Sequence, residues 1–430
     1  SRAATKLSTD DWTVLEDDET QEFVGYDYTS AEVRITRYRK VSAKNKEFYQ
    51  LVLSLTPFYP EGGGQVGDTG VLVQGDQKIG IFDTKKENGI IVHFAKELPA
   101  DLSGNWTAQV SESKRRETSK NHSATHLMHE ALREVLGTHV EQKGSLVNSE
   151  YLRFDFSHFQ KVSDEELTQI EALVNQRIQA NLPLEEFRNI PIAEAKDMGA
   201  MMLFGEKYGD TVRAIKFGSS IELCGGIHVK ATGSIGLFKF TSEGAVAAGV
   251  RRVEAVTGMG AMKYINDALS NLRDAAEVLK NPKDLAGAIQ QLKEKEAVAQ
   301  KEVEALRKEK AMAAAGELEN NIEDHGGVRV IAARTAMDAG SVKDMVFKLK
   351  GQGNTLVIFA NAWEGKATVS IGISDEVVAD KGWHAGNAVR ALAQHIQGGG
   401  GGQPAFATAG GKNPEGLDKV LSDWKNHFAL

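Results

Sequence analysis

Two closely spaced pairs of residues in this 430-residue chain combine side chains that can bind a transition metal. The first pair is His122 and His126, in NHSATHLMHEALREVLG. Apolar residues recur there at helical spacing, and neither Gly nor Pro interrupts them, which predicts a helix. Residues i and i+4 of a helix project from one face, so the two imidazoles can bind one ion. The simpler interpretation is two surface histidines.

The second pair is Cys224 and His228, in ELCGGIHV, where intervening glycines permit a tight turn. Cys224 is the only cysteine, so it cannot form an internal disulfide. It is a buried apolar group, a nucleophile or a ligand, and the nearby histidine favours a ligand. Three imidazoles and one thiolate suit tetrahedral Zn²⁺. We predict one zinc ion bound by His122, His126, Cys224 and His228. His129, on the same helix, is assigned a core or supporting role.

The chain is expected to be a multidomain α+β protein of four regions. Residues 1–112 predict a small N-terminal β-barrel, because Phe48 to Thr56 alternates in hydrophobicity and Asn88-Gly89 is a strong hairpin signal. Residues 113–258 mix helices and strands and hold every predicted ligand, so we expect an α/β domain with the zinc site. Ser163 and Glu166 form a capping box that begins one of its helices.

Residues 259–320 have a different pattern, with apolar side chains stepping by four and three on both sides of Asn281-Pro282. This predicts a helical hairpin with a heptad pattern, a coiled-coil spacer interrupted at the proline. The apolar positions are Ile265, Leu269, Leu272, Ala276 and Leu279, then Leu285, Ile289, Leu292, Ala299, Val303 and Leu306.

Residues 321–430 predict a small C-terminal α/β domain that contains a run of five glycines, 398–402. A glycine loop can bring backbone N–H groups close to a phosphate, which makes Gly399, Gly400 and Gly401 candidate substrate contacts. The alternative is a flexible connection. Lys412 and Lys381 could help neutralise phosphate charge.

The composition is that of a large globular protein. No stretch approaches the ~20 apolar residues that span a bilayer, and a lone cysteine suits a reducing compartment, so we expect a cytoplasmic protein without membrane contact. The net charge of −8 argues against a general nucleic-acid coat protein. It leaves room for local basic patches, which are Lys114-Arg115-Arg116, Lys120 and Arg251-Arg252.

Several long motifs, taken in order, carry a resemblance to a known family. HSATHLMHEAL, VEQKGSLV, ELCGGIHV and GLFKFTSEGAVAAGVRRVEAVTG resemble the editing domain of alanyl-tRNA synthetase. TPFYPEGGGQVGDTG resembles the glycine-rich motif that precedes this domain, and GGGGGQPAFATAGG resembles the C-terminal domain of the same family. Two positions depart from the family pattern, which usually has Thr at Ile227 and Ser at Gly62.

The resemblance implies a zinc-containing hydrolase that edits Ser-tRNA(Ala) and Gly-tRNA(Ala), and a homodimer through the C-terminal domain. Thr125 and Gln142 match residues of the family's editing pocket, and Glu222 is a candidate general base. Expected substrate contacts are Gly63, Gly64, Gln65, Arg251, Arg252, Gly399, Gly400 and Gly401.

Nothing in the sequence resembles the class II aminoacylation domain or the helical tRNA-binding domain of that family. Because the chain begins at Ser1 and enters a β-rich region directly, we expect a C-terminal fragment that does not charge tRNA. One alternative is a freestanding aminoacyl-tRNA deacylase. A second is a non-catalytic tRNA-binding and dimerisation module with structural zinc. A phosphoesterase that shares the C-terminal domain would need an Asp-His-His metal motif, and none is found.

Overall fold

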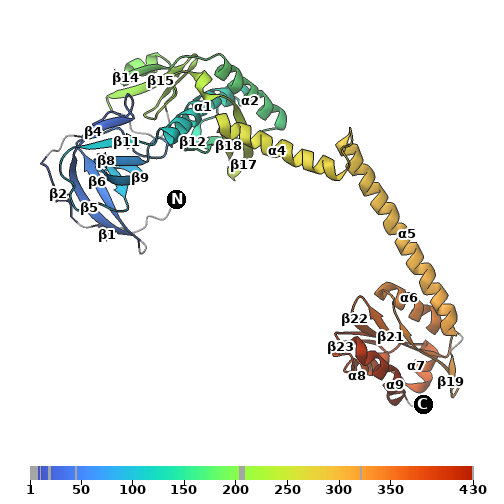
Figure 1. The fold of residues 1–430 in the computed structure, drawn as a ribbon. Coiled ribbons are helices and arrows are strands. Elements are labelled where there is room, and N and C mark those ends of the chain that lie inside the picture. Colours follow the sequence, from blue (N-terminus) through green and yellow to red (C-terminus); the bar gives the residue numbers. More distant parts are fainter. Residues whose placement is uncertain are drawn as a thin grey trace. The chain divides into compact units, whose positions relative to one another are not determined.

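The computed structural model in Figure 1 describes residues 8–9, 11–17, 21–43, 46–202, 209–319 and 322–428. The chain forms two compact units, Ser1–Ala275 and Ala276–Leu430. The four domains expected from the sequence are a finer division, and their boundaries stay a prediction. Among the described residues, no helix combines the length and the apolar composition needed to cross a lipid bilayer.

The first unit begins with a nine-stranded antiparallel sheet. Its strands are β1 (Ser8–Thr9), β2 (Thr13–Val14), β4 (Ser30–Val33), β5 (Ile35–Ala43), β6 (Lys46–Leu53), β8 (Gly70–Gln74), β9 (Gln77–Glu87), β10 (Ile90–Ala95) and β11 (Trp106–Val110). The order is β1-β5-β6-β10-β9-β8-β11-β4, with β2 paired to β5. Two short segments between these strands, β3 (Glu22–Phe23) and β7 (Leu55–Thr56), form a separate parallel pair.

Alternating side chains of this sheet pack into one core around Trp106, with Leu51 and Leu53 of β6 fully buried. Asn88 and Gly89 join β9 to β10 with φ of 50° and 85°, as the predicted tight hairpin requires. The region is therefore antiparallel β as expected. The strand order ends on β1 and β4, and no pairing among the described residues closes a barrel.

The rest of the first unit is a helical layer on two small sheets. Helices α1 (Glu112–Leu136), α2 (Asp164–Gln179), α3 (Ile192–Asp197) and the 3-10 turn η1 (Thr232–Ile235) accompany the sheets β12-β13-β18-β17 and β14-β15-β16. The strands are β12 (Gln142–Val147), β13 (Leu152–Ser157), β14 (Glu185–Pro191), β15 (Thr211–Phe217), β16 (Ser220–Leu223), β17 (Phe238–Ala247) and β18 (Val250–Thr257).

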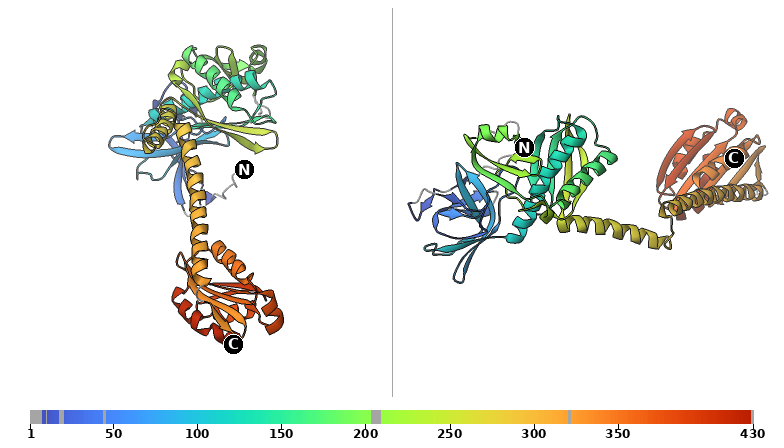
Figure 2. Two further views of the ribbon diagram at one scale, coloured as in Figure 1. Left: turned by 90° about the vertical axis from the view of Figure 1, so that its right-hand side faces the viewer. Right: turned by 90° about the horizontal axis from the view of Figure 1, so that it is seen from above.

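Helices α1 and α2 pack on the four-stranded sheet and share one apolar core with it (Figure 2). The predicted capping box begins α2: Ser163 Oγ accepts from the Glu166 N–H at 3.1 Å, and Glu166 accepts from the Ser163 N–H at 2.8 Å. Residues of α1 from Ala124 to Leu132 belong to this core, so this part of the helix is firmly held beneath the side chains on its other face.

The second unit contains a six-stranded mixed sheet in the order β19-β20-β21-β22-β24-β23. Its strands are β19 (Glu323–His325), β20 (Val328–Thr335), β21 (Thr355–Trp363), β22 (Lys366–Ile373), β23 (Gly398–Gln403) and β24 (Phe406–Gly411). Its helices are α5 (Leu285–Glu319), α6 (Ala339–Lys350), α7 (Asp375–Lys381), α8 (Ala385–Leu392) and α9 (Leu417–Asp423), with 3-10 turns η2 (Pro414–Gly416) and η3 (Trp424–His427). The predicted small α/β domain is thus present.

The glycine run, however, is not the loop that we expected. Residues 398–402 belong to β23, an edge strand paired with β24, and Gly399, Gly400 and Gly401 therefore lie within a hairpin. Close approach of the two backbones explains three of the five glycines, Gly398, Gly400 and Gly402. A Cβ at Gly398, Gly400 or Gly402 would stand 2.0–2.4 Å from a carbonyl oxygen of β24.

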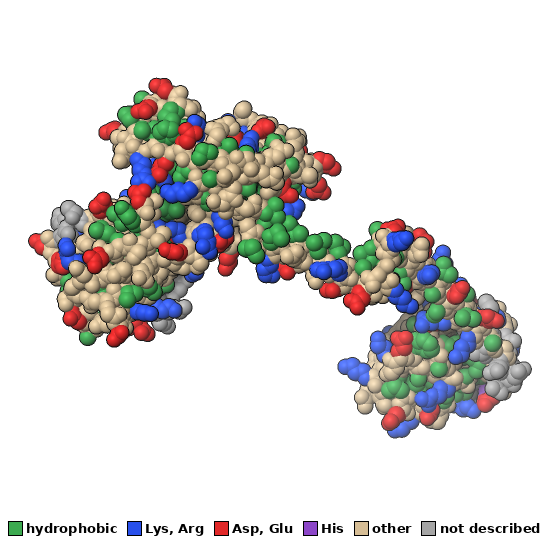
Figure 3. All heavy atoms as spheres, turned by 45° about the horizontal axis from the view of Figure 1, so that its top comes forward, with side chains coloured by type: hydrophobic (Ala, Val, Ile, Leu, Met, Phe, Trp, Pro, Cys, Tyr) green, Lys and Arg blue, Asp and Glu red, His purple; other side chains and the backbone are tan. Residues whose placement is uncertain are grey.

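Helices α4 (Gly258–Val278) and α5 occupy the heptad region. As predicted, helical structure is interrupted between them near Asn281-Pro282. Their apolar stripes are exposed: Leu269 and Leu272 of α4 are 48% and 56% accessible, and Leu306 of α5 is 63% accessible. Figure 3 shows hydrophobic side chains at the surface along α4. Both helices are therefore observed, whereas their pairing as a hairpin stays a prediction.

Burial makes His93 a source of acid sensitivity in the first sheet. Its Nδ1 faces the Leu51 carbonyl at 3.2 Å and its Nε2 faces Thr56 Oγ1 at 2.7 Å, and burial lowers its pKa from 6.5 to about 4. The folded chain thus binds fewer protons here than the unfolded chain between pH 6.5 and pH 4. The free energy of unfolding must therefore decrease as the pH is lowered through this window, by about 2 kcal/mol between pH 7 and pH 5.

We predict that His93→Gln removes this part of the pH dependence. The measurement is the free energy of unfolding in urea at pH 7 and pH 5, for the parent, His93→Gln and the control His139→Gln at an exposed histidine. An equal pH dependence in all three proteins would show that His93 is not the responsible group.

Candidate metal centre

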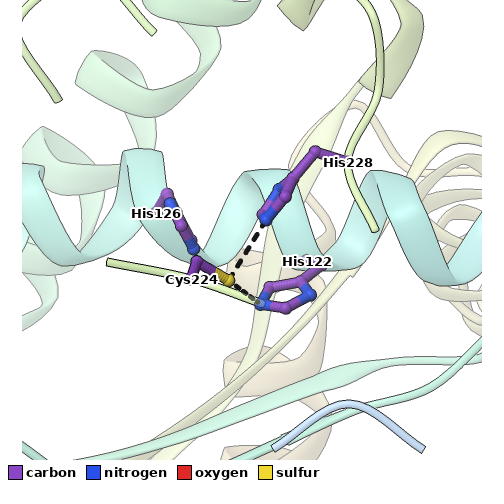
Figure 4. A group of neighbouring side chains, drawn as sticks. All are labelled: His122, His126, Cys224 and His228. Atoms are coloured by element: carbon purple, nitrogen blue, oxygen red, sulfur yellow. Dashed lines mark hydrogen bonds between the residues drawn. The ribbon is translucent and has the colours of Figure 1, made fainter. Parts of the chain in front are cut away.

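Two elements of the first unit bring the four predicted ligands together. Helix α1 presents His122 and His126 from adjacent turns, and the loop after β16 carries Cys224 and His228 to the same point (Figure 4). One ligand atom from each residue lies within 4.8 Å of all the others. The sequence prediction that these four residues converge is therefore confirmed.

The distances fit a tetrahedral ion. Cys224 Sγ lies 3.4 Å from His122 Nε2 and 3.3 Å from His228 Nε2. Zinc bonds of ordinary length would separate sulfur and nitrogen ligands by roughly 3.6 Å. In addition, His126 Nδ1 is buried and has no hydrogen-bond partner among the described residues. The donor set and its spacing thus fit Zn²⁺.

Burial prepares the imidazoles for this role. His122, His126 and His228 are each less than 8% accessible. Burial is the main cause that lowers the pKa of His122 and of His228 well below 6.5, and neighbouring positive groups lower these pKa values further. Burial also lowers the pKa of His126. The three rings are therefore neutral near pH 7, which is the form that binds a metal.

The glycines of ELCGGIHV serve close packing. A Cβ at Gly226 would stand 2.0 Å from Cε1 of His122, whereas a Cβ at Gly225 would meet only the Tyr26 hydroxyl, at 3.9 Å. Neither glycine is among the residues with positive φ. Only Gly226 therefore needs to lack a side chain, so that the loop can lie against the His122 ring.

A small cavity of about 50 Å³ opens beside three of the four ligands, His122, His126 and Cys224. Besides metal ligands, its lining includes four residues singled out from the sequence, which are Gly63, Thr125, Gln142 and Glu222. Thr125 Oγ1 donates to the Asn121 carbonyl at 2.8 Å, one turn earlier in α1. The three predicted catalytic positions thus face one hollow with the metal ligands.

Glu222 is held by His129, whose Nδ1 lies 2.9 Å from Glu222 Oε1, and Glu222 Oε2 lies 3.8 Å from His126 Nε2. Burial opposes ionisation of the carboxyl, but the neighbouring His126 and His129 outweigh it and set the pKa of Glu222 below 4.5. His129 is outside the ligand cluster, as predicted, and supports it from behind.

Other predicted residues lie elsewhere. Gly64 and Gln65 line a neighbouring hollow of about 380 Å³, and only 1% of the surface of Gln65 is exposed. Arg251 and Arg252 on β18 pair with Glu243 and Asp155, at 2.5 Å and 2.6 Å, and neither lines the metal cavity. Their roles in substrate binding, like those of Gly399, Gly400 and Gly401, stay predictions.

Arg115 corrects the expectation of an exposed basic patch at Lys114-Arg115-Arg116. Its guanidinium is buried, ion-pairs with Asp68, and donates to the carbonyls of Gly25 and Pro57 at 2.9 Å and 2.6 Å. It ties the start of α1 to the β-sheet region. Within a basic helical run, the sequence carries no signal that distinguishes a buried, ion-paired arginine from a solvated arginine.

Arg213 on β15 is a site residue that the sequence reasoning missed. Its Nη1 donates to the carbonyls of Cys224 and Gly226, at 2.9 Å and 2.7 Å, and Tyr26 stacks on its guanidinium at 4.0 Å. Tyr26 also donates to the Gly225 carbonyl at 2.7 Å. The two residues hold the ligand loop in place. Because they are distant in sequence, no local pattern could have shown this.

Three family models match separate parts of the chain. The tRNA synthetases class II (A) model matches residues 1–115, the threonyl and alanyl tRNA synthetase second additional domain matches 212–254, and the DHHA1 domain matches 327–429. Cys224 and His228 lie in the second range. Because of the first match, the predicted absence of an aminoacylation region is confirmed only in part.

Relatives match almost the entire chain. The alanine–tRNA ligase of Cytophaga hutchinsonii is 49% identical over 99% of this chain and 49% of its own length. That of Bacteroides fragilis is 52% identical over 98% of this chain and 48% of its own length. The crystal structure of the C-Ala domain from Aquifex aeolicus alanyl-tRNA synthetase is 21% identical, covering 25% of this chain and 98% of that one, with a TM-score of 0.24.

The family models and the curated relatives relate the chain to the aminoacyl-tRNA synthetases as a class. Within this class, its sequence is related along nearly its whole length to the alanyl-tRNA synthetase family, with the second additional domain and the DHHA1 domain. The chain spans about half the length of the curated relatives that it matches.

We predict that Gly226→Ala weakens zinc binding by about tenfold or more, because the added methyl displaces the His122 ring. Gly225→Ala is the matched control, since its methyl meets only the Tyr26 hydroxyl at an ordinary contact distance of 3.9 Å, and it should bind zinc like the parent. Zinc affinity is measured by competition with a chromophoric chelator. Equal affinities of the two variants would mean that contact with His122 does not govern the site.

Proposed function

We propose that the chain hydrolyses the ester of mischarged Ser-tRNA(Ala) and Gly-tRNA(Ala). The observation that carries the proposal is that Thr125, Gln142 and Glu222 line one small cavity with the three metal ligands His122, His126 and Cys224. The relation to alanine–tRNA ligases supplies the substrate class. We also propose that the chain does not itself charge tRNA.

The chemistry of alanine selection explains the need for such a site. A pocket that accepts alanine cannot exclude the smaller glycine, and it rejects serine only weakly, because one small group changes binding by ~1–3 kcal/mol. A second site that hydrolyses the wrong esters corrects the error. An aminoacyl ester is already activated, so a positioned water suffices and no nucleophilic triad is needed.

The size of the cavity suits this substrate. It is a small hollow of about 50 Å³ in which Thr125 lies beside the ligands His122, His126 and Cys224. Thr125 directs its own proton to the Asn121 carbonyl, which leaves lone pairs of Oγ1 to accept a bond from a serine hydroxyl. Its methyl group borders the cavity and limits its size. Because alanine is smaller than serine, discrimination against alanine rests on its missing hydroxyl rather than on steric exclusion.

Glu222 is our candidate for moving the proton of the attacking water. It is buried, lines the cavity and is oriented by His129 at 2.9 Å. Its lowered pKa keeps it ionised near pH 7, as a proton acceptor must be. Gln142 offers an amide to orient the ester from the opposite strand, β12.

When bound at His122, His126, Cys224 and His228, zinc would supply positive charge to orient the substrate. Four protein ligands complete a tetrahedral shell, whereas catalytic zinc ordinarily keeps a position open. For this reason we assign the metal to positioning rather than to water activation. The same observation favours a second candidate, a non-catalytic tRNA-binding module with structural zinc.

Hydrolysis assays separate the two candidates. The full chain is mixed with Ser-tRNA(Ala), Gly-tRNA(Ala) and Ala-tRNA(Ala) under single-turnover conditions. The editing proposal requires rapid loss of the first two esters and survival of the third. Decay of all three at the rate of uncatalysed hydrolysis would leave only the binding module.

The selectivity prediction concerns Thr125→Val, which keeps the volume and removes the hydroxyl. Hydrolysis of Ser-tRNA(Ala) should slow by about tenfold, since a hydrogen bond of ~1–1.5 kcal/mol is lost. Hydrolysis of Gly-tRNA(Ala) should change less, and zinc content should not change. Equal losses on both substrates would assign Thr125 to the backbone or to water rather than to serine.

We further propose that the C-terminal part of the chain, from α4 onward, binds tRNA and mediates self-association. The exposed apolar stripes of α4 and α5 and the match to the DHHA1 domain support this role. Truncation after Gly258 should weaken tRNA binding at matched salt and abolish dimers in sedimentation, while zinc binding remains. A truncated protein that binds tRNA as tightly as the full chain would contradict the assignment.

A further inference from the structure

The side chain of Gln65 reaches the metal centre from outside the elements that provide the ligands. It comes from the glycine-rich segment between β7 and β8, and its Oε1 lies 2.8 Å from His122 Nδ1. The same oxygen accepts a hydrogen bond from the Ile227 N–H at 2.9 Å. One oxygen thus joins the β-sheet region, helix α1 and the Cys–His loop.

The Ile227 contact determines which Gln65 atom faces His122. A backbone N–H can only donate, so the atom opposite it must be the amide oxygen rather than the amide nitrogen. An amide oxygen can only accept, and His122 Nδ1 must therefore carry the proton of the neutral ring. The lone pair is then on His122 Nε2, the atom that lies 3.4 Å from Cys224 Sγ.

The backbone of Gln65 is held firmly enough for this purpose. Gly62 and Gln65 exchange two hydrogen bonds of 3.0 and 3.1 Å, and the Val147 N–H donates to the Gly64 carbonyl at 2.7 Å. Gly64 has φ of +83° and lies so close to Ser145 that a Cβ would stand 2.7 Å from its Cβ. The glycines therefore let the segment lie against β12 and aim Gln65 inward.

The amide nitrogen of Gln65 has no partner in the described part of the chain, which indicates that the amide oxygen is the atom used at the site. Its Nε2 is buried and has no hydrogen-bond partner among the described residues. A glutamine at this position thus leaves one polar group unsatisfied, while its oxygen is used twice. Glutamate would keep this acceptor and place a second carboxylate oxygen where the amide nitrogen lies.

We infer that Gln65 is a positioning residue for the metal: it fixes the tautomer and the ring orientation of His122 so that Nε2 binds zinc. This inference rests on the proposed zinc site and assigns Gln65 to the metal rather than to direct contact with the substrate. Partners of this kind typically contribute 10–100-fold to metal affinity. Ser123 has a similar place behind His228, 3.1 Å from its Nδ1, and it also accepts from the Val229 N–H.

The test compares three variants of the full chain. Gln65→Leu removes the acceptor, Gln65→Glu keeps it, and Gln77→Leu makes the same change at an exposed glutamine of β9. Zinc affinity is measured by chelator competition, and the ligand field is measured by the absorption of the Co²⁺-loaded proteins. Unfolding of the metal-free proteins shows whether each variant folds.

Gln65→Leu should weaken zinc binding by about 10–100-fold and change the Co²⁺ spectrum, while Gln65→Glu and Gln77→Leu bind like the parent. Parental affinity in Gln65→Leu, or weak binding in Gln65→Glu as in Gln65→Leu, would overturn the inference. A parent that binds no zinc would overturn the metal site and this inference together. Loss of affinity as expected, with no ester hydrolysis by the parent, would refute only the hydrolytic function.

Discussion

The convergence of one helix and one loop on a single point is the constraint on which the first unit depends. His122 and His126 come from α1, and Cys224 and His228 come from a loop about a hundred residues later. Burial of three imidazoles beside a half-buried cysteine is costly unless each polar atom has a partner. The surrounding structure supplies part of that partnership through Gln65, Ser123 and Arg213, and an ion of +2 charge would complete it.

This constraint explains why the β-sheet region and the mixed α/β region form one compact unit. Arg115 ties the first turn of α1 to Asp68 and to carbonyls of the sheet region, and Gln65 reaches from that region to His122. Arg213 and Tyr26 restrain the opposite side, at the Cys–His loop. The site is therefore held by contacts from both regions, and a change in either should be felt at the ligands.

The ligands could be predicted because their signals are local. Helical spacing joined His122 to His126, and a lone cysteine near a histidine identified Cys224 and His228. Asn88-Gly89 and the Ser163–Glu166 box were likewise set by short-range backbone chemistry. Roles that depend on partners distant in sequence could not be predicted. Arg115 forms a buried ion pair, and Arg251 and Arg252 pair with carboxylates. The glycines at 399–401 belong to a strand paired with β24.

The central claim is that an ion at these four residues and ester hydrolysis belong to one site. It is tested most directly by stripping the chain of metal, adding back zinc in steps, and measuring both bound zinc and the single-turnover rate on Ser-tRNA(Ala). The account predicts that the rate rises in proportion to bound zinc and levels off at about one ion per chain, and that Cys224→Ala abolishes both. A full hydrolysis rate in protein shown to be free of zinc would contradict it.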